Sequence, residues 1–121
     1  MECETLYFAD ALQSLQRMGV STKAFIATGG GARSDAWLQI KADIFGVPFV
    51  RPRISEGSLL GAAMLAGIGT GVLASAREAV NRFVAEDRIF TPDPARHAAY
   101  QEKTALYRQV FPATREILKQ L

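Results

Sequence analysis

Cysteine is nearly absent from this sequence, which has only Cys3 among its 121 residues. One thiol cannot form a disulfide within the chain, and it argues against a zinc cluster. We therefore predict no metal site in this chain. The low cysteine content is typical of a protein from a reducing compartment.

Long hydrophobic runs are also missing. The longest nearly apolar stretch, residues 59–68, is too short to cross a bilayer. The first residues are acidic and lack the basic start of a signal peptide. These features predict no membrane association, and together with the single thiol they favour a cytoplasmic location.

Charge of one sign is not in excess. The formal net charge is +2, and the basic residues are scattered along the chain. No basic stripe interleaved with aromatic residues is present, which argues against nucleic acid as a partner. Internal repeats, low-complexity segments and flexible linkers are absent as well. With 49% apolar residues, the chain has enough material for the core of at most one domain.

Glycine, in contrast, is concentrated at one place. Residues 29–31 are consecutive glycines that follow an apolar run containing Phe25 and Ile26, which suit a buried strand. Ser34 is a good helix N-cap, and apolar residues at 37, 40 and 44 have helical spacing. The pattern predicts a strand, a glycine turn and a helix N-terminus. Backbone N–H groups and the helix dipole would favour a phosphate there.

The local pattern leaves two interpretations of the glycine turn open. The turn lacks a P-loop lysine, and Arg33 and Ser34 replace the third glycine of the dinucleotide fingerprint. It either binds a phosphate against its backbone or merely lets the helix pack close to the strand. A dinucleotide-binding half-domain is disfavoured, because the apolar run at 47–50 leads into Arg51 and not into an acidic residue.

Apolar periodicity predicts one further strand and five helices. The strand is expected at 47–50, and the helices at 3–18, 34–45, 56–66, 75–84 and from Pro94 onward, with a kink at Pro112. The inner stripe of the first helix is predicted from Phe8, Ala11, Leu12, Leu15 and Met18. That of the last is predicted from Leu106, Val110, Ala113, Ile117 and Leu121, with Tyr100, Tyr107 and Phe111 widening it.

The helix expected at 56–66 is apolar on nearly every side, and two strands make a poor sheet alone. An element of this kind needs cover on several faces. We therefore expect the chain to be covered either by a larger fold or by a second copy of itself, as a homo-oligomer.

Several short motifs follow one another along the chain. They are 28–34 (TGGGARS), 37–39 (WLQ), 42–43 (AD), 46–48 (GVP), 56–63 (EGSLLGAA) and 91–94 (TPDP), with Tyr100 and Tyr107 after them. Their order and spacing resemble the C-terminal domain of FGGY-family carbohydrate kinases, such as xylulokinase-like enzymes. The opening helix fits less well, because Cys3 stands where the family usually has glycine after Glu2.

The resemblance implies an α/β fold: a helix-rich part, with few strands, of an actin-like ATPase (ribonuclease H-like) lobe. Residues 1–121 would form a truncated C-terminal domain. The implied nucleotide is ATP, with the glycines against its α-phosphate and Ser34 near the adenine. The residues implied to bind it are Gly29, Gly30, Gly31, Ala32 and Ser34.

The same resemblance also implies what the chain lacks. Such kinases pass the γ-phosphate of ATP, with Mg²⁺, to a sugar hydroxyl, and their catalytic aspartate and sugar site lie ahead of the region matched here. We therefore predict no catalytic residue in this chain, ATP or ADP as its ligand, and an absent N-terminal sugar-binding lobe as its partner. The alternative is a non-catalytic module that self-associates through a sheet edge and the apolar helix.

Four residues near these motifs have mainly structural interpretations. Asp43 is predicted to be structural, and His97 to be a surface or packing residue and not a metal ligand. Trp37 shares an apolar stripe with its helical neighbours, which favours a core anchor over an adenine stacker. Glu56 is expected to be a hydrogen-bonded first-turn carboxylate, with a distant part of the ATP site as the alternative.

Overall fold

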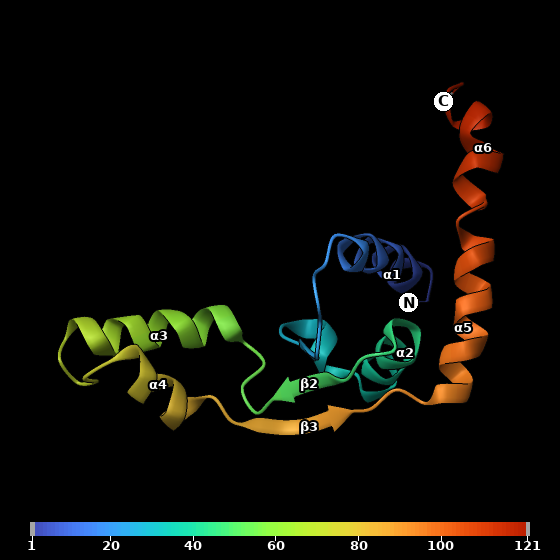
Figure 1. The fold of residues 1–121 in the computed structure, drawn as a ribbon. Helices are drawn as coiled ribbons and strands as arrows, with labels where there is room; N and C mark the ends of the chain where they lie inside the picture. The colour runs from blue at the N-terminus through green and yellow to red at the C-terminus, as the bar shows by residue number, and fades with distance from the viewer. Residues whose placement is uncertain (1, 121) are drawn as a thin grey trace.

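The computed structural model describes residues 2–120 of the chain (Figure 1). In chain order, its elements are α1 (Glu2–Arg17), β1 (Phe25–Ile26), the 3₁₀ turn η1 (Gly30–Arg33), α2 (Asp35–Phe45), β2 (Phe49–Pro52), α3 (Gly57–Gly69), α4 (Ala76–Phe83), β3 (Glu86–Phe90), α5 (Pro94–Tyr107) and α6 (Val110–Leu118). Among these residues, the helices are all too short or too polar to cross a membrane.

The strands form one sheet in the order β1–β2–β3. β1 runs parallel to β2, whereas β3 runs antiparallel to it. The sequence predicted the first two strands and missed β3. This strand is rich in charge, and all of its residues except Phe90 are exposed, so no apolar alternation reveals it.

One face of the sheet carries a row of phenylalanines. The register aligns Phe25 with Phe49 and Phe49 with Phe90, so their side chains share a face. The rings of Phe25 and Phe49 stack with 5.1 Å between centroids, and Phe45 of α2 meets Phe25 edge-on at 5.3 Å. Leu38 of α2 is fully buried in this cluster. The main core therefore lies between α2 and one face of the sheet.

The opposite face of the sheet is left open by the residues that the structure describes. Ile26, Val50 and Ile89 are register partners on this face. Ile26 is 71% exposed, so its predicted burial is wrong within this chain. Sheets with parallel strands are normally covered on both faces. This open row, Ile26–Val50–Ile89, is thus a surface suited to a partner.

α1 packs on α2 and α5 through a face next to the predicted one. Leu6, Ala9 and Leu12 are buried there. Of the predicted stripe only Leu12 is buried, whereas Phe8 is 54% and Met18 79% exposed. The predicted rotation of α1 is therefore wrong. Periodicity showed that the helix has an apolar side but could not show which part of that side would meet α2.

α3 and α4 form a hairpin that projects from the body of the chain (Figure 1). α3 lies wholly within the described residues and has no buried residue; Leu59 and Leu65 are 72% and 71% exposed. The all-round apolar helix was predicted correctly, and this chain does not supply its cover. The predicted cap of α4 is present in altered form: Ser75 Oγ accepts the N–H of Glu78 at 3.2 Å, but the Glu78 carboxylate accepts the N–H of Ala74, one residue before the N-cap, at 2.8 Å.

The hairpin is closed at its base by one main-chain hydrogen bond. The N–H of Arg53, just after β2, donates to the carbonyl of Ala85, just before β3, at 2.8 Å. The chain therefore leaves the sheet after β2 and returns to the same place before β3. The whole hairpin stands between two strands that are neighbours in the sheet.

The predicted start of α5 and the predicted break near Pro112 are both confirmed. Asp93 Oδ1 accepts the N–H groups of Ala95 and Arg96 at 2.9 and 3.0 Å, with Pro94 in the first helical position. The hydrogen bond from the Arg96 N–H holds the pKa of Asp93 below its ordinary value. The helix is interrupted just before the first turn of α6, where Pro112 lies. Figure 1 shows α5 and α6 as one nearly straight rod.

The predicted inner stripe of this rod is wrong. Leu106, Val110 and Ile117 are 66%, 51% and 64% exposed, and Leu121 lies outside the described residues. Of the residues predicted to widen the stripe, Tyr100 and Tyr107 do pack against the cluster that includes Leu6 and Ala9 of α1, whereas Phe111 is 65% exposed.

Asp43 of α2 holds the start of α5 against α2. Its side chain is 3% exposed, and Oδ1 accepts the side-chain N–H of Gln39 at 2.9 Å and the main-chain N–H of Asp93 at 2.8 Å. Oδ2 pairs with Nε of Arg96 at 2.7 Å. The predicted structural role of Asp43 is confirmed by this geometry. It fixes the start of α5 against the last turn of α2.

Tyr100 provides a pH-dependent test of the contact between α5 and α1. Its hydroxyl donates to Glu2 Oε1 at 2.7 Å, and this hydrogen bond, with burial, raises the pKa of Tyr100 to about 12. The unfolded chain ionises this phenol at about 10. The stabilisation is therefore complete below about pH 10 and is lost as the pH rises from about 10 to about 12.

We expect Glu2→Gln to lower the pKa of Tyr100, because it removes the carboxylate that favours the neutral phenol. Titration of phenolate absorbance in the two proteins measures this shift. Identical titration curves would contradict the contact between Tyr100 and Glu2.

Candidate functional site

The predicted strand–turn–helix unit is present. β1 leads into η1, and α2 begins directly after it. Gly29, just before η1, has φ 75°, a conformation that favours glycine. Ser34 is the N-cap of α2, as predicted, and its Oγ accepts the N–H of Trp37 at 3.2 Å. The turn is therefore fixed at both ends.

The residues of the turn differ in what their amides can do. The N–H of Gly29 donates to the carbonyl of Ser55 at 2.7 Å, and the N–H of Ala32 donates to the carbonyl of Gly29 at 3.1 Å. Ala32 is also buried, at 2% exposure. The amides of Gly30 and Gly31 stand in the first turn of η1, where a helix leaves its N–H groups without an internal acceptor. These two amides are the donors that the turn can offer to an anion.

Gly30 and Gly31 also differ in their surroundings. A Cβ added at Gly30 would meet nothing within 4 Å, so this position faces open space. A Cβ at Gly31 would lie 2.8 Å from Cζ3 of Trp37, closer than a methyl group can come. Gly31 is therefore required by packing within the protein. Gly30 is the position at which a ligand can approach the backbone.

The N-terminus of α3 lies beside the turn. Gly29 is hydrogen-bonded to Ser55, just before α3, and Gly57 packs against Thr28. A Cβ added at Gly57 would lie 3.4 Å from Thr28 Cγ2. At the rim, Arg33 of η1 pairs with Glu56 at 2.9 Å. The first turns of η1 and α3 therefore lie next to each other, joined through the pairs Gly29–Ser55 and Thr28–Gly57.

Glu56 differs from the hydrogen-bonded first-turn carboxylate that was predicted, and its alternative role as a distant part of the ATP site stays a prediction. It occupies the N-cap position of α3, but its side chain makes no capping hydrogen bond. It pairs with Arg33 instead, and both side chains are largely exposed. A surface pair of this kind contributes little stability. The charge of Arg33 could not be assigned a partner from sequence, because the two residues are far apart along the chain.

An ionic network that the sequence analysis missed holds the start of α2 against the sheet. Arg51 of β2 donates to Asp35 at 2.6 Å and to Asp87 at 2.7 Å, and Arg88 of β3 pairs with Asp35 as well. The hydrogen bond to Asp35 raises the pKa of Arg51 further above its ordinary value. Asp35, in the first turn of α2, thus connects the end of the glycine turn to two strands.

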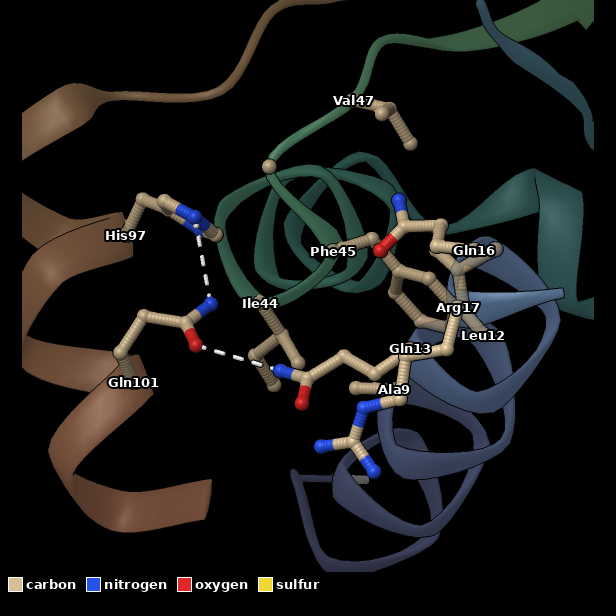
Figure 2. A pocket seen from close by; sticks show the side chains of 11 residues that line it. Ala9, Leu12, Gln13, Gln16, Arg17, Ile44, Phe45, Val47, His97 and Gln101 are labelled. Carbon is tan, nitrogen blue, oxygen red and sulfur yellow. Dashed lines mark hydrogen bonds between the residues drawn. The ribbon is translucent and has the colours of Figure 1, made fainter. Parts of the chain in front are cut away.

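His97 lies away from the turn, in a polar pocket between α1, α2 and α5 (Figure 2). Its Nδ1 is 2.8 Å from the carbonyl of Asp43, and its Nε2 is 3.2 Å from Gln101, which in turn accepts from Gln13. The ring also packs against Gly46, at the left-handed C-cap of α2. His97 is a packing residue, as predicted. Among the described residues, no group of three or more His, Cys, Asp or Glu could hold a metal ion.

Comparison with known proteins agrees with this geometry. Residues 2–70 match the FGGY family of carbohydrate kinases, C-terminal domain. The chain is 32% identical over 112 residues to a xylulose kinase of Staphylococcus epidermidis, covering 93% of this chain and 23% of that protein. It is 35% identical over 92 residues to an autoinducer-2 kinase of Escherichia coli, covering 76% and 17%.

The fold is similar to a solved structure of the same kind. The crystal structure of ligand-bound xylulose kinase from Lactobacillus acidophilus superposes with a TM-score of 0.77 and 30% identity, over 92% of this chain and 22% of that one. The chain therefore spans less than a quarter of the length of these proteins. The predicted fold, part of an actin-like ATPase (ribonuclease H-like) lobe, is confirmed. By the match of residues 2–70 and these relatives, the chain belongs to the FGGY family of carbohydrate kinases, in the region of their C-terminal domain.

Proposed function

We propose that this chain supplies the adenine-nucleotide site of a sugar kinase, which transfers the γ-phosphate of ATP to a sugar hydroxyl. The observation that carries the proposal is the pair of amides at Gly30 and Gly31 in the first turn of η1, beside the N-termini of α2 and α3. Backbone donors of this kind bind phosphate oxygens without any charged side chain. Membership of a carbohydrate kinase family makes ATP the ligand that this turn would hold.

The roles of the turn residues follow from their geometry. Gly30 and Gly31 would donate to the α-phosphate. Gly29, Ala32 and Ser34 would hold the turn in shape, through the left-handed backbone of Gly29, the buried side chain of Ala32 and the helix cap of Ser34. This assignment narrows the direct phosphate contacts from the three predicted glycines to two, and it keeps the expectation that Ser34 lies near the adenine.

Phosphoryl transfer needs a nucleophile, a metal and the phosphates positioned together. The described residues form no carboxylate cluster that fits Mg²⁺, so we derive no catalytic step through the metal in this chain. We propose that the metal site, the catalytic base and the sugar site belong to a further lobe, with residues 1–121 as part of a C-terminal domain. The chain alone would then transfer no phosphate.

We propose that this lobe also covers the open apolar surfaces. The row Ile26–Val50–Ile89 and the α3 side chains Leu59 and Leu65 are exposed in the described chain. The relatives are more than four times as long as the region matched here, which provides ample chain for such cover. We place the enzyme in the cytoplasm, because its one cysteine is free and exposed, as suits a reducing compartment.

The matched region does not determine which sugar is the phosphate acceptor. Relatives of similar identity are named for different substrates, xylulose in one case and autoinducer-2 in the other. A domain shared by both therefore does not determine the acceptor. We propose only that the acceptor is a small hydroxylated molecule of the sugar class.

Titration of the chain with AMP, ADP and ATP, followed by amide NMR, tests the nucleotide site. We expect shifts at Gly30 and Gly31 with roughly millimolar affinity. ADP and ATP should bind almost equally, because the contacts are to the α-phosphate and base. An absence of shifts at the turn would contradict the proposal. Sugar-dependent ATP turnover by the pure chain would contradict the assignment of catalysis to another lobe.

A second candidate function is self-association without catalysis, and the fully exposed leucines of α3 favour it. The same samples distinguish it by size-exclusion chromatography. A chain that forms defined oligomers and shows no nucleotide shifts would be an interaction module. A chain that shows the shifts, whatever its oligomeric state, would be a nucleotide-binding one.

A further inference from the structure

We propose that Trp37 is a positioning residue that sets where the amides of Gly30 and Gly31 stand, and thereby the affinity of the nucleotide site. The part concerning affinity rests on the proposed function. Trp37 is neither a simple core anchor nor an adenine stacker in this assignment. Its ring is the surface on which the glycine turn lies.

The ring is held by contacts from three parts of the chain. The main chain of Trp37 is fixed by the cap at Ser34, because its N–H donates to Ser34 Oγ at 3.2 Å. The indole Nε1–H lies 3.5 Å from Oγ1 of Thr5, a buried residue of α1. On the ring face, Nζ of Lys41 lies 4.0 Å from the ring centroid, at cation–π distance. These contacts leave the ring little freedom to move.

The contact with the turn is tight. The position of a Cβ at Gly31 is 2.8 Å from Cζ3 and 3.3 Å from Cε3 of the ring. The backbone of the turn therefore rests on the indole edge with no room for one methyl group. At the adjacent Gly30 a Cβ would meet open space. One residue of the turn is thus in contact with the ring, and its neighbour faces outward, where a phosphate would bind.

This arrangement connects α1 to the candidate site through a single side chain. α1 contributes Thr5, α2 contributes Trp37 and Lys41, and η1 contributes Gly31. A change in the ring's size should move the turn amides. A larger residue at Gly31 should be tolerated if the ring at Trp37 becomes smaller.

A cycle of four proteins tests the proposal: the wild type, Gly31→Ala, Trp37→Phe and the double variant. The added methyl group in Gly31→Ala must push the turn off the indole, so we expect affinity for ATP to fall about tenfold. Trp37→Phe withdraws the indole edge and should weaken binding about threefold. In the double variant the methyl group fills the space left by the smaller ring, and affinity should recover to within about threefold of the wild type.

The recovery is the readout that a purely structural role would not give. If Trp37 only stabilised the core, the losses of stability in the two single variants would add and lower the folded fraction. The affinity of the folded protein for ATP would then stay constant. Affinity by calorimetry and stability by urea unfolding are therefore measured on all four proteins. Additive losses in affinity, or wild-type affinity in Gly31→Ala, would overturn the proposal.

A second measurement does not depend on nucleotide. Amide chemical shifts and hydrogen exchange at Gly30 and Gly31, in the free proteins, should change in both single variants and return toward wild type in the double variant. If the wild type binds no nucleotide but this pattern is present, the proposed function fails and the positioning role of Trp37 stands. Unchanged turn amides in Trp37→Phe would refute that role.

Discussion

Replacing Asp43 with alanine should lower the free energy of unfolding by about 3 kcal/mol. The side chain is almost fully buried and accepts two hydrogen bonds on Oδ1, from Gln39 and from the main chain of Asp93, besides its ion pair with Arg96. Alanine leaves the buried N–H of Asp93 without this acceptor. Since small domains are stable by only about 5–15 kcal/mol, the loss is a large share of the total.

Asp43→Asn is the matched control, because it keeps the shape and the Oδ1 acceptor and removes the charge together with the Oδ2 acceptor of Arg96. Arg96 is 57% exposed, so it can turn toward water when the carboxylate is lost. We expect asparagine to cost about 1 kcal/mol. Urea unfolding followed by circular dichroism measures both variants. Equal costs for alanine and asparagine would show that charge, and not the Oδ1 hydrogen bonds, holds α5 on α2.

The second large effect is expected at Gly30. A valine there would project into the open space beside the turn amides, where we place the α-phosphate. The block should cost about 2–3 kcal/mol of binding, similar to the loss of charged hydrogen bonds and equivalent to an increase of about 30-fold to about 150-fold in KM. Folding should be little affected, because no atom of the described chain lies within 4 Å of the added Cβ.

A chimera makes this effect measurable as enzyme kinetics. The matched region of the Staphylococcus epidermidis xylulose kinase is replaced by this chain, and KM is measured for ATP and for xylulose. Gly30→Val should raise KM for ATP alone. Gly69→Val, at the far end of α3 and also in open space, is the control and should change neither value. Equal increases for both substrates would indicate misfolding and not a blocked phosphate contact.

Gly31 would be the wrong position for that experiment, because a larger residue there clashes with Trp37. The sequence alone does not reveal this difference between Gly30 and Gly31. Three consecutive glycines predict a turn and a close approach of some group to the backbone, and both expectations match the fold. Which glycine faces a ligand and which faces the protein depends on Trp37, whose ring reaches back from α2 to Gly31. A contact of this kind depends on side-chain direction, which the local pattern does not contain.

The parts of the fold that could be predicted are those with a local physical cause. The caps at Ser34, Ser75 and Asp93 require only neighbouring residues, and all three are present. β3 could not be predicted, because its pairing with β2 is stabilised by partners such as Arg51 and Asp87, which are distant in sequence.

The predictions of which sides of α1 and α6 are buried were wrong for a related reason. An apolar stripe shows that a helix side is suited to burial, but a neighbour must be present to bury it. Phe8 and Ile117 lie on such stripes and are 54% and 64% exposed. For the site, the sequence predicted the strand, turn and helix that are present, but it could not show that the amides of Gly29 and Ala32 have acceptors within the protein.

The hydrogen bond between Arg53 and Ala85 has a consequence for the order of folding. β2 and β3 can pair only after the chain between them, with α3 and α4, has been brought back on itself, whereas a tight turn would need almost no such closure. Closing this long loop costs about 2 kcal/mol more free energy, through lost chain entropy, than closing a tight turn. Contacts between segments so distant in sequence form slowly. The parallel pair β1–β2 with α2 should therefore assemble first, and β3 should join it last.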